Sequence, residues 1–136
     1  MLSALYTSPL FDLIHRRGGT SLGMYIDDGL LCSIATDYDA VSRRLQDTYV
    51  ICDEWLRRNN LSCEAAKTEL IYFRGCRLND PPTRLELFNA STGGEPFVVH
   101  PTATIRYLGF FVNRKLDWLD HVDMMCNRER GSLKVF

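Results

Sequence analysis

The stretch that organises this chain reads Tyr25-Ile26-Asp27-Asp28-Gly29. Apolar residues flank it, and the segments 21–26 and 30–35 are predicted to be β-strands. An Asp-Gly pair between two such runs is a strong hairpin signal, so we expect a hairpin with two carboxylates at its tip. Magnesium is commonly held by one or two carboxylates together with substrate phosphates, which makes Asp27 and Asp28 candidate metal ligands. Turn chemistry alone also explains an Asp-Gly pair, so an ordinary solvated tip remains the alternative.

The length and composition are those of an ordinary globular protein. The chain has 136 residues, which predicts one domain, with 46% hydrophobic and 24% charged residues. No apolar run approaches the roughly 20 residues that a membrane-spanning helix needs, and the N-terminus shows no secretory signal pattern. The formal net charge of −1 argues against a strongly cationic nucleic-acid binder.

Cysteine and histidine patterns argue against a zinc site. The five cysteines are scattered without a C-x-x-C pair, and the three histidines (His15, His100 and His121) are isolated in sequence. An odd number of cysteines without a secretory signal fits reduced thiols in the cytosol or nucleus. We therefore expect an intracellular protein, nuclear or cytoplasmic, without a membrane partner.

Helix signals mark the segments on both sides of the hairpin. Apolar spacing predicts a first helix over residues 2–14, started or interrupted at Ser8-Pro9 and ended by Gly18-Gly19. Thr36-x-x-Asp39 resembles a capping box that opens a second helix of about five turns, which Asn59-Asn60 ends. One apolar stripe runs along this second helix at three- and four-residue spacing: Val41, Leu45, Thr48, Cys52, Trp55 and Leu56.

The later part of the chain is predicted to consist mainly of strands. The predicted strands are 70–73, 85–88, 97–99 and 104–112. Asp117 or Asp120 is predicted to cap a closing helix that runs through Met124 and Met125. The order of helix, hairpin, long helix and strands predicts an α+β fold, with helices packed on one face of an antiparallel sheet.

Several motifs in a fixed order resemble one protein family. Tyr25-Ile26-Asp27-Asp28 is similar to the Y-x-D-D box of reverse transcriptases. Residues 61–73 resemble the L-S-x-x-x-x-K-T-E-x-x-x-F pattern of retroelements that lack long terminal repeats. Residues 105–112 resemble the R-Y-L-G strand of that family, and residues 117–122 resemble its x-W-x-x-H-V helix start. The chain thus resembles the RNA-directed DNA polymerase (reverse transcriptase) of non-LTR, LINE-like retrotransposons.

The resemblance implies a nucleotidyltransferase that uses Mg²⁺ or Mn²⁺. In such enzymes two metals stabilise the entering and leaving oxygens of an in-line phosphoryl transfer. Asp27 would be the principal metal ligand with Asp28 beside it, and Lys67 matches a catalytic lysine near the phosphates of the incoming nucleotide. A surface lysine at a strand entry is the alternative for Lys67. The implied partners of the complete enzyme are an RNA template, a DNA primer and deoxynucleoside triphosphates.

Nucleic-acid contacts are implied at two further places. Tyr25 would lie beside the primer terminus or the template strand. Tyr107, Leu108 and Gly109 match the strand that grips the primer, where glycine allows close approach of the backbone. Cross-strand packing also explains Tyr25, and core packing also explains Tyr107 and Leu108.

The resemblance also implies that parts of the family enzyme lie outside residues 1–136. Another catalytic aspartate and the fingers would precede Met1, and the thumb would follow Phe136. Residues 2–10 resemble the end of the template-contacting motif, without its Gln-Gly pair. Residues 1–136 are therefore expected to form a palm fragment, from that motif through the primer-grip strand, that is inactive alone. Its free sheet edges would pair with the missing upstream half or with another copy.

Two other functions stay open at this point. A palm remnant could be a non-catalytic module that binds nucleic acid or a protein, although the near-neutral charge argues against tight nucleic-acid binding. A metal-dependent nuclease built on Asp27 and Asp28 is the third alternative, and the sequence places no third carboxylate or general base for it.

Overall fold

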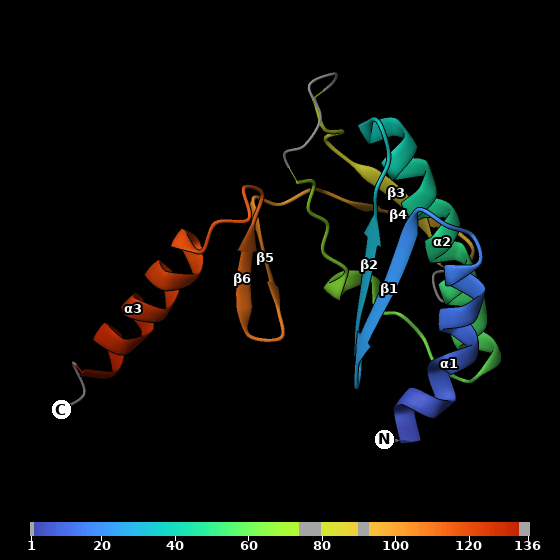
Figure 1. Ribbon diagram of the computed structural model, residues 1–136, viewed down its shortest axis with the longest axis horizontal. Helices are drawn as coiled ribbons and strands as arrows, with labels where there is room; N and C mark the ends of the chain where they lie inside the picture. The colour runs from blue at the N-terminus through green and yellow to red at the C-terminus, as the bar shows by residue number, and fades with distance from the viewer. Residues whose placement is uncertain (1, 74–79, 90–92, 134–136) are drawn as a thin grey trace. The chain divides into compact units, whose positions relative to one another are not determined.

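The protein has a mixed α+β fold, as its sequence predicts. The structure, a computed structural model, describes residues 2–73, 80–89 and 93–133. Over these residues it contains three α-helices, one short 3₁₀ helix and six strands (Figure 1). All three strand pairs are antiparallel, but the described strands form three separate hairpins where one sheet was expected. None of the described helices is long and apolar enough to cross a membrane.

The chain divides into two compact units, whereas its length alone predicted a single domain. The first unit comprises Met1–Thr68 and Cys76–His100, and the second comprises Glu69–Gly75 and Pro101–Phe136. The first unit contains two helices and two hairpins, and the second contains the third hairpin and the last helix.

The first helix, α1 (Leu2–His15), forms as predicted and continues through Pro9. Proline removes one backbone hydrogen bond from a helix interior, so the sequence favoured a start or a break there. Packing of the following residues compensates for that loss. Leu10 and Ile14 are each only 1% exposed and form a buried cluster with Cys52.

The predicted acidic hairpin consists of β1 (Thr20–Tyr25) and β2 (Asp28–Ser33). Tyr25 pairs with Asp28, so the two-residue turn is Ile26-Asp27. Both strands therefore begin and end slightly earlier than predicted, by one residue for β1 and by two for β2.

The predicted turn at Asp28-Gly29 is wrong, and strand packing explains why. The observed register places Leu22 opposite Leu31, and both side chains pack against the buried cluster of Leu10, Ile14 and Cys52. Burial on one face strongly specifies strand register. The gain from burying this apolar pair outweighs the local preference of an Asp-Gly pair for a turn.

The long helix, α2 (Tyr38–Arg58), has its N-cap one residue later than predicted. Asp37, not Thr36, has the extended backbone of a cap, and its carboxylate accepts a 2.7 Å hydrogen bond from the Ala40 amide. The Thr36 hydroxyl donates to the same carboxylate at 3.2 Å. The capping box predicted from Thr36 and Asp39 is therefore wrong, whereas the end of α2 at Asn59 is confirmed.

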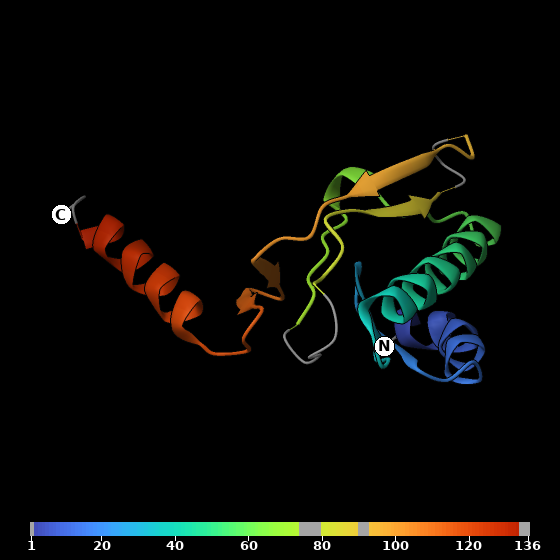
Figure 2. The same ribbon diagram turned by 90° about the horizontal axis from the view of Figure 1, so that it is seen from above.

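Helix α2 lies between two layers of the first unit. Figure 2 shows it between α1 and the hairpin of β3 (Leu85–Phe88) and β4 (Pro96–Val99). One face carries Cys52 toward α1, and Tyr49 packs edge-on against Phe97 of β4 with ring centroids 5.8 Å apart. Both strands match their predicted positions.

A buried amide ties the loop after α2 to this helix. Asn89 is 1% exposed, and its amide nitrogen donates to the Tyr49 hydroxyl at 3.2 Å and to the Cys63 carbonyl at 3.1 Å. Burial raises the pKa of Tyr49 to about 12, so its hydroxyl stays protonated at neutral pH. The 3₁₀ helix η1 (Ala65–Lys67) follows this tethered loop.

The second unit departs from two strand predictions. Residues 70–73 form no strand, and Leu70 makes only a single parallel bridge to Pro101. The strand predicted over 104–112 is divided into β5 (Thr104–Tyr107) and β6 (Phe110–Asn113). A turn at Leu108-Gly109, where both residues have positive φ, separates the two strands, although the apolar run around it predicted one continuous strand.

The last helix, α3 (Leu119–Leu133), is fixed to this third hairpin through its N-terminal residues. The Asp117 carboxylate accepts from the Leu119 amide at 3.3 Å and from the Asn113 side-chain amide at 2.7 Å. The Thr104 hydroxyl donates to Asp120 at 3.0 Å. Of the two aspartates proposed for the helix start, Asp117 accepts from a backbone amide there, whereas Asp120 lies inside α3 and contacts Thr104 of β5.

Replacement of Ile26 by asparagine should stabilise the first unit. Ile26 has φ +53°, which strains a β-branched residue, and its side chain is 66% exposed. Asparagine tolerates this conformation, so Ile26→Asn should raise the free energy of unfolding in urea by about 1 kcal/mol. Ile34→Asn is the matched control, because Ile34 is 80% exposed and is not among the positive-φ residues. Equal effects of the two substitutions would contradict the strain at Ile26.

Helix capping by Asp37 should depend on pH. Hydrogen bonds from the Ala40 amide and then the Thr36 hydroxyl lower the pKa of Asp37 in the folded protein. Its stabilisation is therefore fully present above the ordinary carboxyl pKa and is lost as the pH falls through the lower folded pKa. Thermal melting should place Asp37→Asn near the unsubstituted protein at neutral pH and Asp37→Ala below both. In acid, the unsubstituted protein should lose stability relative to Asp37→Asn; parallel pH curves for these two would contradict the assignment.

Candidate functional site

The tip of the β1–β2 hairpin holds three of the predicted site residues together. Tyr25 and Asp28 form the last pair of the ladder, so their side chains project from the same face of the hairpin. Asp27 stands next to them in the turn. Both carboxylates are exposed, and the Tyr25 side chain is 59% exposed. The tip therefore presents two acids and one aromatic ring to solvent.

The two carboxylates keep their capacity to bind a cation. Within residues 2–73, 80–89 and 93–133, neither Asp27 nor Asp28 has a hydrogen-bond or ion-pair partner. An exposed acid at a turn is also what an ordinary solvated tip would show. Ile26 has the positive φ that the first position of a two-residue hairpin turn requires, and this conformation is strained for a β-branched residue.

The opposite end of the hairpin is held by a residue that the sequence did not single out. Arg44 of α2 donates through Nη1 to the Ile34 carbonyl, just after β2. A Cβ at Gly19, which has φ +72°, would lie 2.5 Å from the same nitrogen. Glycine at this position therefore leaves room for the guanidinium.

Arg44 is an exposed residue of α2 and lies off the apolar stripe of this helix. The sequence signal for this contact is the Gly18-Gly19 pair directly before β1. The pair was predicted only to end the first helix, but Gly19 also leaves room for the Arg44 side chain. The Gly19 carbonyl also accepts from the Ile34 amide at 3.0 Å and from the Ser33 hydroxyl at 3.2 Å. The base of the hairpin is thus anchored to α2, which limits how its tip can move.

Lys67 forms an ion pair with a neighbour and is not joined to the acidic tip by any contact in the described structure. Its Nζ lies 2.6 Å from the Glu64 carboxylate, and both side chains are exposed. The hydrogen bond from Lys67 to Glu64 raises the pKa of the lysine, so it carries its charge throughout the physiological range. Lys67 also lies in the 3₁₀ helix η1 rather than at the entry to a strand.

The predicted primer-grip residues belong to the second unit and form a hairpin end, not a continuous strand. Tyr107 pairs with Phe110 at the end of the ladder, and Leu108-Gly109 makes the turn. Leu108 has φ +49° and Gly109 has φ +85°, the pattern of a type I′ turn. Leu108 is 41% exposed, so it is a surface residue rather than a core one.

The tip supplies the right donors for Mg²⁺ or Mn²⁺ but too few of them for a two-metal centre. Two hard carboxylates suffice for a magnesium ion that also binds water and substrate phosphates. A pair of metals about 4 Å apart needs further ligands. In the part of the chain that the structure describes, no three His, Cys, Asp or Glu side chains come together as a metal site. The residues therefore fit a partial site.

Comparisons with known proteins identified no similar protein. No protein-family model, no curated protein and no solved structure matches the chain.

Proposed function

We propose that this chain is a palm segment of a reverse transcriptase of the non-LTR retrotransposon type, and that its β1–β2 hairpin carries part of the metal site. The observation that supports this most directly is the pair of exposed carboxylates, Asp27 and Asp28, at the strained tip of an anchored hairpin. The same five-residue stretch resembles the Y-x-D-D box, so the sequence motif and the exposed position of its two carboxylates both favour metal binding.

Each residue of the tip has a distinct role in this proposal. Asp27 and Asp28 would hold Mg²⁺ or Mn²⁺, which when bound stabilises the oxygens that enter and leave in phosphoryl transfer. Tyr25 projects from the same face as Asp28, so its exposed ring can contact a primer or template next to the metal ligands. The anchored base of the hairpin keeps these side chains in a fixed relation, as positioning of reactants requires.

Lys67 and the third hairpin have supporting roles. Lys67 carries a positive charge that can neutralise phosphate, provided that its exposed ion pair with Glu64 opens, and exposed pairs of this kind are weak. The turn Leu108-Gly109 offers an exposed backbone that could approach a nucleic-acid strand closely.

The proposed site is incomplete within the described residues. At least one more carboxylate must come from another segment, and the RNA template, DNA primer and deoxynucleoside triphosphates are substrates of that complete enzyme. Because that carboxylate is not found beside the tip among the described residues, we expect the chain to be inactive alone.

A non-catalytic interaction module is the second candidate, and one observation favours it. Apolar side chains of the second unit are exposed in unusual number, on the turn of the third hairpin and along α3. Exposed apolar surface that is continuous commonly marks a binding surface. The metal-binding residues of the first candidate lie in the first unit, whereas the exposed apolar residues of the second candidate lie in the second unit.

Metal binding at the tip can be measured without activity. Mn²⁺ titration of the purified chain, followed by electron paramagnetic resonance, should detect weak binding. Asp27→Asn and Asp28→Asn should each weaken it about tenfold, the loss expected from removing one adjacent charge. Asp47→Asn is the matched control, because Asp47 is an exposed acid elsewhere on α2. Equal binding by all four proteins would exclude a metal site at the tip.

Primer extension tests whether the site is complete. With an RNA template, a DNA primer, deoxynucleoside triphosphates and Mg²⁺ or Mn²⁺, the isolated chain should give no extension above a blank. Extension that disappears in Asp27→Ala would show that the carboxylates present suffice, and would overturn the proposed incompleteness.

A further inference from the structure

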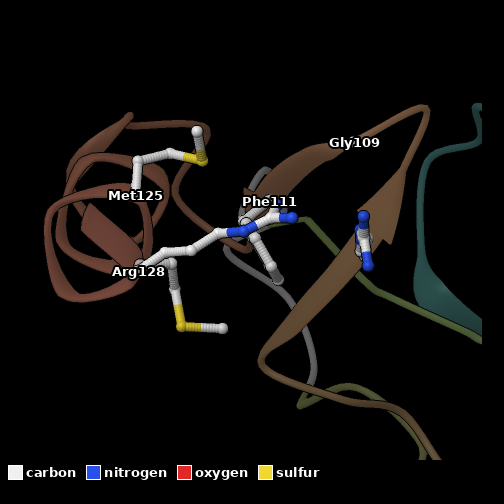
Figure 3. A pocket seen from close by; sticks show the side chains of 6 residues that line it. Gly109, Phe111, Met125 and Arg128 are labelled. Carbon is white, nitrogen blue, oxygen red and sulfur yellow. The ribbon is translucent and has the colours of Figure 1, made fainter. Parts of the chain in front are cut away.

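The second unit contains a pocket that shares only Gly109 with the residues of the proposed function. The third hairpin and α3 line an open pocket of about 280 Å³ (Figure 3). The residues that line it are Arg106, Gly109, Phe111, Met124, Met125 and Arg128. All six belong to the same unit, so the pocket lies within one compact body.

The two walls of the pocket are joined by hydrogen bonds and ring contacts. The Phe111 amide donates to Nδ1 of His121 at 3.3 Å, which connects β6 directly to α3. The His121 ring also lies 5.4 Å from the Phe110 ring and 5.9 Å from the Trp118 ring, measured between centroids. His121 is isolated from other histidines and cysteines in the sequence, and it lies in the first turn of α3, with Trp118 directly before that helix.

The lining of the pocket combines cations with soft apolar groups. Arg106 is the cross-strand partner of Phe111, and its guanidinium carbon lies 5.9 Å from the centre of that ring. Figure 3 shows Arg128 extending from α3 toward Phe111, with Met125 on the same helix. Such a lining suits an apolar group that carries a negative charge beside it.

Exposed apolar side chains belong to the pocket lining and adjoin it. Met124 and Met125 of the lining are both exposed, as is Leu108, which precedes Gly109 in the chain. Methionine, aromatic residues and arginine are enriched at the centres of protein–protein interfaces, and methionine adapts to different partner side chains. The composition is therefore that of a protein-binding surface.

A nucleic acid fits this surface less well than an acidic peptide. Nucleic-acid affinity comes mostly from several phosphate contacts, whereas only two cations line the pocket. A peptide needs only one or two carboxylates beside an apolar anchor.

We propose that this pocket binds an acidic segment of a partner protein, with one large apolar side chain inside and carboxylates at Arg106 and Arg128. The inference is independent of the metal-binding hairpin, because it uses only residues of the second unit. A bidentate pair between arginine and carboxylate would give the contact direction as well as strength.

The test uses the full chain and a defined probe. A fluorescein-labelled peptide, Glu-Glu-Leu-Phe-Glu-Glu-Leu, is titrated with the protein and followed by fluorescence anisotropy. Binding should be saturable and should weaken about tenfold or more in Arg106→Gln and in Arg128→Gln, since each loses a charge-assisted contact. Met125→Gln should weaken it several-fold. Arg130→Gln, an equal charge change on α3 outside the pocket lining, should leave it unchanged.

Control probes and folding measurements make each outcome decisive. A peptide with glutamine in place of glutamate should bind at least about tenfold more weakly, because it lacks the charges. Circular dichroism and thermal melting establish that the variants are folded. Equal loss in Arg130→Gln, tighter binding of single-stranded RNA that depends on the same two arginines, or self-association that Met125→Gln abolishes would each overturn the proposal.

Discussion

The packing of the β1–β2 hairpin against α1 and α2 is the constraint on which the candidate site depends. An isolated two-stranded hairpin is marginally stable at best in water and needs a helix or further strands to persist. Here Leu22, Met24 and Leu31 pack on the cluster of Leu10, Ile14 and Cys52, and full burial of one such side chain contributes about 1.5 to 3 kcal/mol. The same contacts set the register, and the register decides that Asp27 lies in the turn and Asp28 opens β2.

The other two hairpins follow the same physical rule. The β3–β4 hairpin buries Leu85, Leu87 and Val99 beneath α2, and the β5–β6 hairpin is held to α3 by hydrogen bonds near the helix start. The difference between them lies in what stays exposed. The third hairpin and α3 leave large apolar side chains exposed to solvent. The buried hydrophobic residues of the described structure include none from residues 101–133.

Much of the local structure could be predicted from the sequence, because it follows from local chemistry. The helical stripe on α2, the Asn59 end and the short strand 85–88 rest on periodicity and capping, which neighbouring residues decide. The predictions that failed needed tertiary information. The turn predicted at Asp28-Gly29 does not form, because packing of Leu22 and Leu31 sets a different register. The turn within 104–112 was not predicted, because leucine at position 108 gives no local sign of a positive φ. The apolar run 70–73 has the composition of a strand but only a single bridge for Leu70.

The candidate site divides in the same way. The chemistry of the tip, two acids beside Tyr25, is readable directly from five consecutive residues. The ion pair of Lys67 with Glu64 and the contact of Arg44 with the hairpin base depend on helical turns and on a close approach across the fold. Glu64 and Lys67 are only three residues apart, whereas Arg44 and the hairpin base are distant in sequence and meet only after the core has formed, so no pattern of spacing could reveal the Arg44 contact.

The buried cluster has a kinetic consequence for the chemistry of its own thiol. Burial raises the pKa of Cys52 to about 12, and its side chain is only 5% exposed between α1 and the hairpin. Since the thiolate is the reactive form, an electrophile in solution can modify Cys52 only after α1 or the hairpin has moved away. The rate of that modification therefore depends on how often α1 and the β1–β2 hairpin separate. Thiol modification of Cys52 would thus report the opening of the core that holds the acidic hairpin.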